Sequence, residues 1–171
     1  MELAVAQLDT ATARDFDSIV GPWLEPGFRL AVTMLRNPDE ARDAVQEAAV
    51  KAWRSLDRLR DVDQARSWFL AIVANECRST MRRPWWNFHT FESRPTPLAN
   101  PEDSAVRSLD LDRAMERLSP NDRALLHLHF FLDLPLEEIG RVLHISSGAA
   151  RTRVYRAAHR LRPGLSEEEM A

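Results

Sequence analysis

A proline-rich segment in the middle of the chain separates two stretches whose apolar residues recur at helical spacing. The segment covers residues 82–104, RRPWWNFHTFESRPTPLANPEDS, and has no helical period of its own. Its prolines are Pro84, Pro95, Pro97 and Pro101. Proline removes a backbone donor and clashes with the preceding turn, so a helix does not continue through such a segment. We therefore predict two helical units joined by a linker.

The composition points to helices rather than sheets, because the 171 residues include only five glycines and few β-branched runs. The predicted fold class is all-α, with two small helical domains, a Pro-rich linker and a helix-turn-helix in the C-terminal domain. The predicted boundaries are 10–83 for the first domain, 84–105 for the linker and 106–165 for the second domain.

In the first domain, a helical stretch over about 12–36 is expected in two pieces, because Pro22 and Pro26 interrupt it. A second helix is expected from Asn37-Pro38 to about residue 56, since asparagine caps helices and proline suits the first turn. A third is expected over 63–83, with an apolar face that becomes basic toward its C-terminal end.

In the second domain, helices are expected over about 106–118 and from Ser119-Pro120 to about residue 132. Two shorter helices are expected over 136–143 and 147–162. Two helices joined by about four residues form a helix-turn-helix, whose second helix can enter the major groove of DNA. The small Gly140 is expected where the two helices come close together.

Six arginines lie in the stretch 136–162, LEEIGRVLHISSGAARTRVYRAAHRLR, although the whole chain has a formal net charge of -3. Arginine reads guanine in the major groove and binds phosphate. The pattern therefore indicates duplex DNA binding by the last helix. An ordinary helical hairpin with a solvated basic face is the alternative that this stretch alone leaves open.

Several other classes of protein are disfavoured by the sequence. The single Cys77 permits no internal disulfide or zinc-finger pattern, and no stretch is long and apolar enough to insert in a membrane. The N-terminus lacks the features of a secretory signal, so a cytoplasmic location is expected. His127, His129 and His144 do not converge with other ligands, so no metal and no cofactor are expected. No catalytic constellation is apparent, and we expect no enzyme.

Three segments taken together resemble a known family, the extracytoplasmic-function sigma factors of bacterial RNA polymerase. They are RNPDEARDAVQEAAVKAWRSL, ARSWFLAIVANECRSTMRR, and LDLDRAMERLSPNDRALLHLHFFLDLPLEEIGRVLHISSGAARTRVYRAAHRLR. The resemblance covers roughly residues 16–161. It implies a protein that binds core RNA polymerase and directs it to promoters, with the first domain on the minus-ten element and the second on the minus-thirty-five element.

The resemblance also implies roles for individual residues. The polymerase-binding surface is expected at Asp43, Gln46 and Glu47. Single-stranded minus-ten DNA is expected to contact Arg58, Arg60, Arg66, Asn75, Arg78, Arg82 and Arg83. The minus-thirty-five duplex is expected to contact Arg151, Thr152, Arg153, Tyr155 and Arg156. Because relatives are commonly held inactive by an anti-sigma protein, such a partner is expected here as well.

The chain departs from the family pattern in three places. The family usually has an aromatic residue near Ala49, so the lost volume is filled by Trp23 or Phe28, or the packing is looser there. Ala149-Ala150 replaces a frequent threonine-valine pair, which weakens one phosphate contact. Three roles stay open for the linker aromatics Trp85, Trp86, Phe88 and Phe91: they anchor the linker in the polymerase channel, stack on the template strand, or fold back onto either helical domain.

Two functions remain open from the residues alone. The chain is either a sigma factor or a helix-turn-helix regulator that binds DNA without polymerase. The acidic helix DEARDAVQE favours the sigma factor, because a sensory domain does not need it. In a sigma factor with loosely tethered domains, the free protein is expected to bind duplex DNA weakly until polymerase sets the spacing of the domains.

Overall fold

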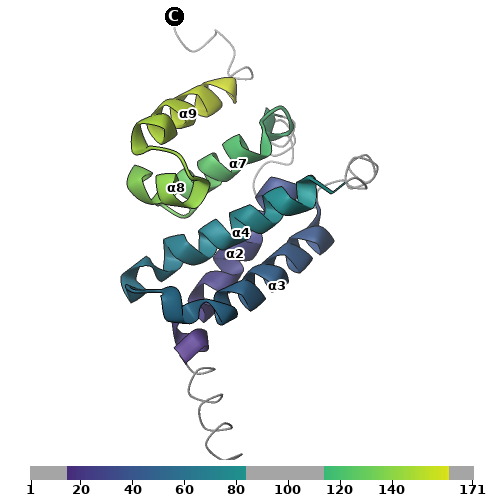
Figure 1. Cartoon of the computed structure of the whole chain (residues 1–171). Coiled ribbons are helices and arrows are strands. Elements are labelled where there is room, and N and C mark those ends of the chain that lie inside the picture. The colour runs from purple at the N-terminus through teal and green to yellow at the C-terminus, as the bar shows by residue number, and fades with distance from the viewer. Residues whose placement is uncertain (1–14, 84–113, 162–171) are drawn as a thin grey trace, which may run out of the picture.

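The computed structural model describes residues 15–83 and 114–161, which are helical apart from the connecting turns (Figure 1). Three long helices form the N-terminal module: α2 (Gly21–Leu35), α3 (Pro38–Arg54) and α4 (Ala65–Met81). The C-terminal module contains α7 (Pro120–Leu126), the π-helix η3 (His127–Phe131), α8 (Leu136–Leu143) and α9 (Ser147–Arg160). No strand occurs within the described residues, as expected for an all-α fold.

The N-terminal module begins with the break that the sequence predicts before Pro22. Residues 15–19 are helical, the helix is interrupted at Val20, and α2 starts at Gly21. The second predicted break is wrong, because Pro26 lies inside α2 and the helix continues to Leu35. One missing backbone hydrogen bond is evidently offset by the burial of Leu30, Met34 and other residues later in the helix.

Local capping chemistry sets the start of α3. The Asn37 side chain accepts hydrogen bonds from the backbone N–H groups of Asp39 and Glu40, at 3.0 and 3.2 Å. Pro38 follows in the first turn, where no donor is needed. Two short 3-10 turns, Leu56–Arg58 and Val62–Gln64, lead from α3 into α4.

In the C-terminal module, Ser119 caps α7 by accepting a hydrogen bond from Asp122 N–H at 3.1 Å. The helix predicted to about residue 132 changes form at His127 and widens into η3, which ends with Leu132 N–H bonded to the His127 carbonyl. Asp133 then takes a positive φ of 49° and turns the chain toward α8. The bounds of α8 agree with the prediction.

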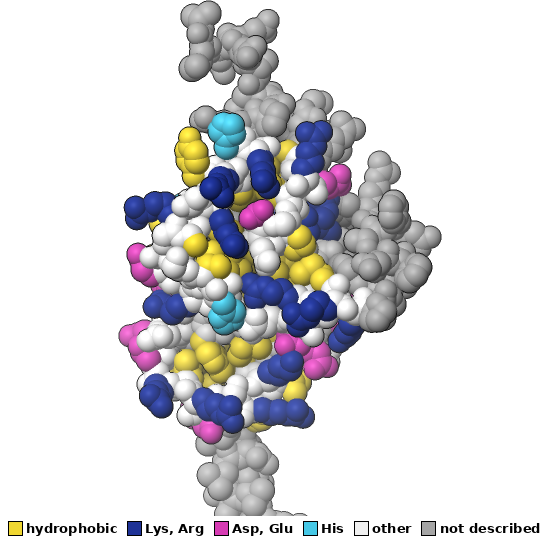
Figure 2. Space-filling model, turned by 45° about the horizontal axis from the view of Figure 1, so that its top comes forward, with side chains coloured by type: hydrophobic (Ala, Val, Ile, Leu, Met, Phe, Trp, Pro, Cys, Tyr) yellow, Lys and Arg dark blue, Asp and Glu magenta, His cyan; other side chains and the backbone are white. Residues whose placement is uncertain are grey.

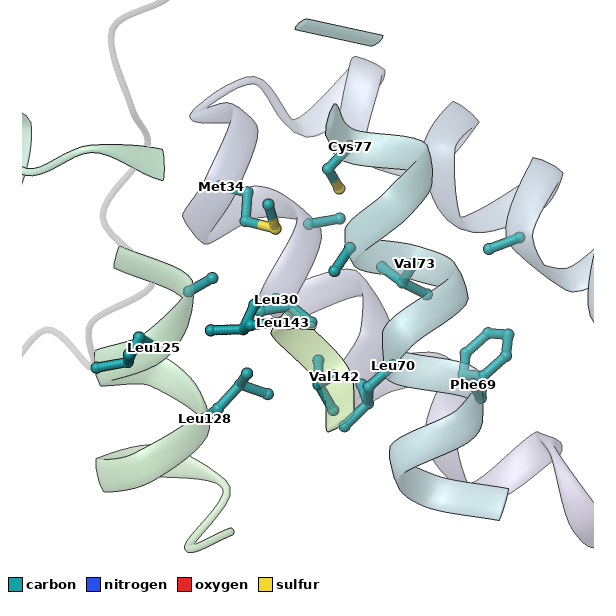
Figure 3. Packing of buried hydrophobic residues seen from close by; sticks show 14 of the residues in the cluster. Leu30, Met34, Phe69, Leu70, Val73, Cys77, Leu125, Leu128, Val142 and Leu143 are labelled. Carbon is teal, nitrogen blue, oxygen red and sulfur yellow. The ribbon is translucent and has the colours of Figure 1, made fainter. Parts of the chain in front are cut away.

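The two modules share one hydrophobic core. Helix α4 packs on α8, and α2 packs on α7. Leu30 and Met34 of α2 lie near Leu125 and Leu128, and Val142 and Leu143 of α8 reach the same core, with Val142 beside Leu70 of α4 (Figure 3). All of these side chains are buried or nearly so. Fully burying a side chain of this size stabilises a fold by about 1.5–3 kcal/mol, so the contact between the modules is substantial.

A buried arginine reinforces this contact. Arg123 of α7 donates to the carbonyls of Thr33 and Met34 near the C-terminal end of α2, at 2.9 and 2.7 Å. It also donates to the Leu118 carbonyl at 2.8 Å. The close packing differs from the loose tethering expected from the sequence.

The linker aromatics Trp85, Trp86, Phe88 and Phe91 lie outside the described residues. Within the parts of the chain that are described, no helix has the length and hydropathy needed to cross a bilayer.

Candidate nucleic-acid and polymerase interfaces

Helix α9 presents a basic face with few competing contacts. Arg151, Arg153 and Arg156 are exposed, and none of them pairs with another described residue. Thr152 and Tyr155 lie on the same exposed surface; the Thr152 hydroxyl donates to the Gly148 carbonyl at 3.1 Å. These five residues are the ones predicted to contact duplex DNA, and the structure brings them together on one helix. Figure 2 shows basic side chains distributed over this side of both modules.

The opposite side of α9 is held by the rest of the helix-turn-helix. Ala150 and Ala157 are buried, and Val154, Ala158 and Leu161 are partly buried against the core. Ser146 caps the helix by accepting from Ala149 N–H at 3.1 Å. A helix anchored in this way leaves its basic face free for a major groove.

The turn between α8 and α9 closes tightly over Gly140. A Cβ atom at this position would lie 2.6 Å from the Ile145 carbonyl oxygen and 3.5 Å from the Ser147 nitrogen. Gly140 is therefore required by the backbone of the turn. His144, which directly follows the last residue of α8, has a positive φ of 57°.

We expect Gly140→Ala to lower the free energy of unfolding by about 2 kcal/mol, because the backbone oxygen cannot move aside without distorting the turn. Gly148→Ala is the matched control, because nothing lies within 4 Å of the Cβ position of residue 148 in α9. The free energy of unfolding of this variant should rise by up to about 1 kcal/mol. Urea unfolding measures both. If Gly140→Ala were as stable as the wild type, the turn would be adaptable.

Helix α3 carries the predicted polymerase-binding residues on one side. Asp43, Gln46 and Glu47 are exposed, and their spacing of three and four residues places them on one face. A groove of about 590 Å³ runs beside this face, between α2 and α3. Its lining residues are Gly21, Leu24, Glu25, Phe28, Arg42, Val45, Gln46 and Ala49. Phe28 and Ala49 both line this groove and both pack against the core.

The residues predicted to contact the minus-ten strand fall into two groups. Arg58 and Arg60 lie exposed in the turns before α4, and Arg82 and Arg83 lie exposed after it. These four are open to a ligand at opposite ends of the helix.

The other three predicted minus-ten residues contact the C-terminal module. Arg66 forms a bidentate ion pair with Glu138, with the shortest distance 2.9 Å. The Asn75 amide nitrogen lies 3.3 Å from His144 Nε2. Arg78 donates to Asn121 Oδ1 at 3.1 Å and lies 3.5 Å from the Leu143 carbonyl. Burial lowers the pKa of Arg78, with the Arg82 charge acting in the same direction.

The sequence did not reveal these partners. Nothing in the sequence near Glu138, Asn121, Arg123 or His144 indicates a contact with the other helical domain. Each partner lies more than 40 residues away along the chain from the side chain that it contacts.

The three histidines considered as metal ligands are placed differently from one another. His127 is buried with Nδ1 3.4 Å from Thr33 Oγ1, and His129 contacts the Phe130 ring edge-on. His144 contacts Asn75. No group of three or more potential ligands assembles a metal site among the described residues.

Two family models match the chain, in order. The model described as Sigma-70 region 2 matches residues 21–87, and the model described as Sigma-70, region 4 matches residues 108–161. The first match contains α2 to α4, and the second contains the helix-turn-helix.

Curated relatives are similar over most of their length. The RNA polymerase sigma factor CarQ of Myxococcus xanthus is 34% identical over 142 residues, which cover 80% of this chain and 81% of CarQ. The RNA polymerase sigma factor SigV of Bacillus subtilis (strain 168) is 28% identical over 144 residues, which cover 84% of this chain and 87% of SigV.

A solved structure has a similar fold. The sigma factor RpoE from Bartonella quintana, in complex with the anti-sigma factor NepR, superposes with a TM-score of 0.73 at 23% identity. The superposition covers 89% of this chain and 97% of that one. At this level of identity the likeness concerns the fold.

Proposed function

The chain belongs to the extracytoplasmic-function sigma factors, and we propose from this membership how its described surfaces divide the work of transcription initiation. Such a protein binds core RNA polymerase and directs it to promoters. The observation that carries this function is the order of the two sigma regions along one chain, together with an exposed basic face on α9.

The C-terminal module is proposed to read the minus-thirty-five element as duplex DNA. Arg151, Arg153 and Arg156 are available for guanine edges and phosphates, and Thr152 and Tyr155 add polar contacts. This assignment is supported by their common exposure on α9 and by the anchoring of its other side.

The N-terminal module is proposed to bind polymerase and the minus-ten element. Exposed Asp43, Gln46 and Glu47 give α3 an acidic face, which suits a basic surface on the polymerase. Single-stranded DNA needs a positive track, and the proposed track comprises Arg58, Arg60, Arg66, Asn75, Arg78, Arg82 and Arg83.

The partners are core polymerase, promoter DNA in duplex and single-stranded form, and an anti-sigma protein. The resemblance to a sigma factor solved with an anti-sigma factor supports the last of these. We also propose that the chain contributes no catalytic chemistry, that it needs no metal or cofactor, and that it acts in the cytoplasm with the polymerase. A regulator without polymerase docking is disfavoured, because the N-terminal match is to sigma region 2.

Replacing both Asp43 and Gln46 by alanine should weaken binding to purified core polymerase by about tenfold or more, since two central contacts of one small face are lost. Fluorescence titration of labelled protein with core enzyme measures the affinity. Asp17→Ala, which also removes an exposed acid, should bind as the wild type does. An unchanged affinity of the double variant would remove this face from the proposed interface.

A further inference from the structure

We propose that the C-terminal module masks the middle of the minus-ten surface by mimicking nucleic acid. Glu138 binds Arg66 in the place of a DNA phosphate, and polar groups of the C-terminal module contact Asn75 and Arg78. This inference rests on the proposed function, because it concerns the regulation of the same minus-ten residues.

The contact between Arg66 and Glu138 has the form of a phosphate contact. Arg66 Nε lies 3.2 Å from Glu138 Oε2, and Arg66 Nη2 lies 3.0 and 2.9 Å from Oε1 and Oε2. Two guanidinium nitrogens and two carboxylate oxygens thus meet in the planar fork that arginine also offers to phosphate. The two side chains are only 30% and 20% exposed, and the Trp23 ring lies 5.9 Å from the guanidinium.

The next residues along α4 are occupied in the same way. Asn75 contacts His144, and Arg78 contacts Asn121 and the Leu143 carbonyl. Arg78 also donates to Asn75 Oδ1 at 2.7 Å, which ties the two readers together. Asn75 is itself exposed, but its amide contacts both His144 and Arg78, and the half-buried Arg78 guanidinium is engaged within the protein.

Masking is confined to the part of α4 that faces α8 and the start of α7. Arg58 and Arg60 before the helix, and Arg82 and Arg83 after it, are exposed. A single strand can therefore reach both ends of the track, while the half-buried Arg66 and Arg78 in the middle are held by partners in the C-terminal module. Full engagement requires α8 to leave α4, which also uncovers the apolar side chains of Val142 and Leu143.

The packed arrangement lowers the apparent affinity for single-stranded DNA. When only an open fraction of molecules can bind, the apparent Kd equals the intrinsic Kd divided by that fraction. Weakening one contact that exists only in the closed form raises the open fraction. Polymerase, by holding the two modules apart, would remove the mask.

The test compares two glutamate variants of the full-length protein. Glu138→Gln keeps the shape of the side chain but removes the charge that pairs with Arg66. Glu137→Gln makes the same charge change one residue earlier, at an exposed side chain that no described residue pairs with. The control matters because removing any negative charge favours DNA binding slightly.

Fluorescence anisotropy with a labelled single-stranded oligonucleotide pool of mixed sequence gives the affinity. We expect Glu138→Gln to bind about threefold to tenfold more tightly than Glu137→Gln, as expected for the loss of one charge-assisted pair in the closed form. Equal affinities of the two variants would overturn the masking role of Glu138.

A covalent staple tests the exclusion directly. Arg36 Nη2 and Glu116 Oε1 lie 3.0 Å apart across the modules and belong to neither proposed DNA surface. The two cysteines of the variant Arg36→Cys/Glu116→Cys can be bridged by a short bis-maleimide whose spacer contains a disulfide, and a reductant then cleaves this disulfide. Burial raises the pKa of Cys77 to about 12, so this thiol does not compete for the reagent near neutral pH.

The stapled protein should bind the oligonucleotide pool at least about fivefold more weakly than the same protein after cleavage. In the presence of core polymerase, it should support transcription only after cleavage. Full binding and transcription by the stapled form would contradict the proposal. If instead the wild-type protein confers no start-site selection on core polymerase, the proposed function itself fails.

Discussion

Replacing Arg123 by methionine should lower the free energy of unfolding by about 3 kcal/mol. Arg123 is 7% exposed and donates to three backbone carbonyls, those of Leu118, Thr33 and Met34. Methionine retains much of the apolar stem but leaves these acceptors without their donor. Each buried polar group left without a partner costs about 1–3 kcal/mol. Methionine also avoids the free-energy cost of burying the arginine charge, which offsets part of this loss.

Urea denaturation followed by circular dichroism measures this loss. Arg117→Met is the matched control, because Arg117 is an exposed arginine in the turn before α7, and its replacement should change stability by no more than about 0.5 kcal/mol. If the two variants were equally stable, the carbonyls would have found other donors and Arg123 would not secure the contact between the modules.

Acidification from pH 7 to pH 4 should cost up to about 3 kcal/mol of stability through His127 alone. Burial lowers the pKa of His127 from 6.5 to about 4, and the Arg29 charge acts in the same direction. The unfolded chain therefore binds a proton near pH 6.5, whereas the folded protein binds it only near pH 4. Stability falls as the pH falls through this window and levels off below it.

The contribution of His127 is isolated by comparing pH profiles of unfolding, since carboxylates also titrate at the acidic end. Phenylalanine cannot bind the proton. Between pH 7 and pH 4 the free energy of unfolding of His127→Phe should therefore fall by about 3 kcal/mol less than that of the wild type. His159→Gln, at an exposed position on α9, should keep the wild-type slope. Identical slopes for wild type and His127→Phe would show that His127 is not held neutral by the fold.

Sequence rules that consider only neighbouring residues predicted the helix caps and helix bounds that depend on those residues. The caps at Asn37 and Ser119 and the bounds of α8 follow from side chains a few residues apart, and the structure confirms them. Pro26 shows the limit of these rules: its cost inside α2 is small compared with the burial of that helix against α3, α4 and α7, which no local window contains.

Of the candidate binding surfaces, one could be predicted from the sequence and the other could not. The exposed face of α9 could be predicted, because helical spacing alone separates its arginines from its alanines. The occupation of Arg66, Asn75 and Arg78 could not, because it depends on how two helical modules pack across many residues of chain. Neither the burial of Arg123 nor the widened turn at η3 has a clear pattern in the sequence.

Start-site mapping over a pooled promoter library tests most directly that this chain directs polymerase to promoters. Purified core polymerase is combined with the wild-type protein or with Arg151→Ala/Arg156→Ala, and transcript 5′ ends are sequenced. We expect the wild type to produce a defined set of start sites with shared upstream elements, and the double variant to lose most of them. Transcripts indistinguishable from those of core polymerase alone would contradict the function.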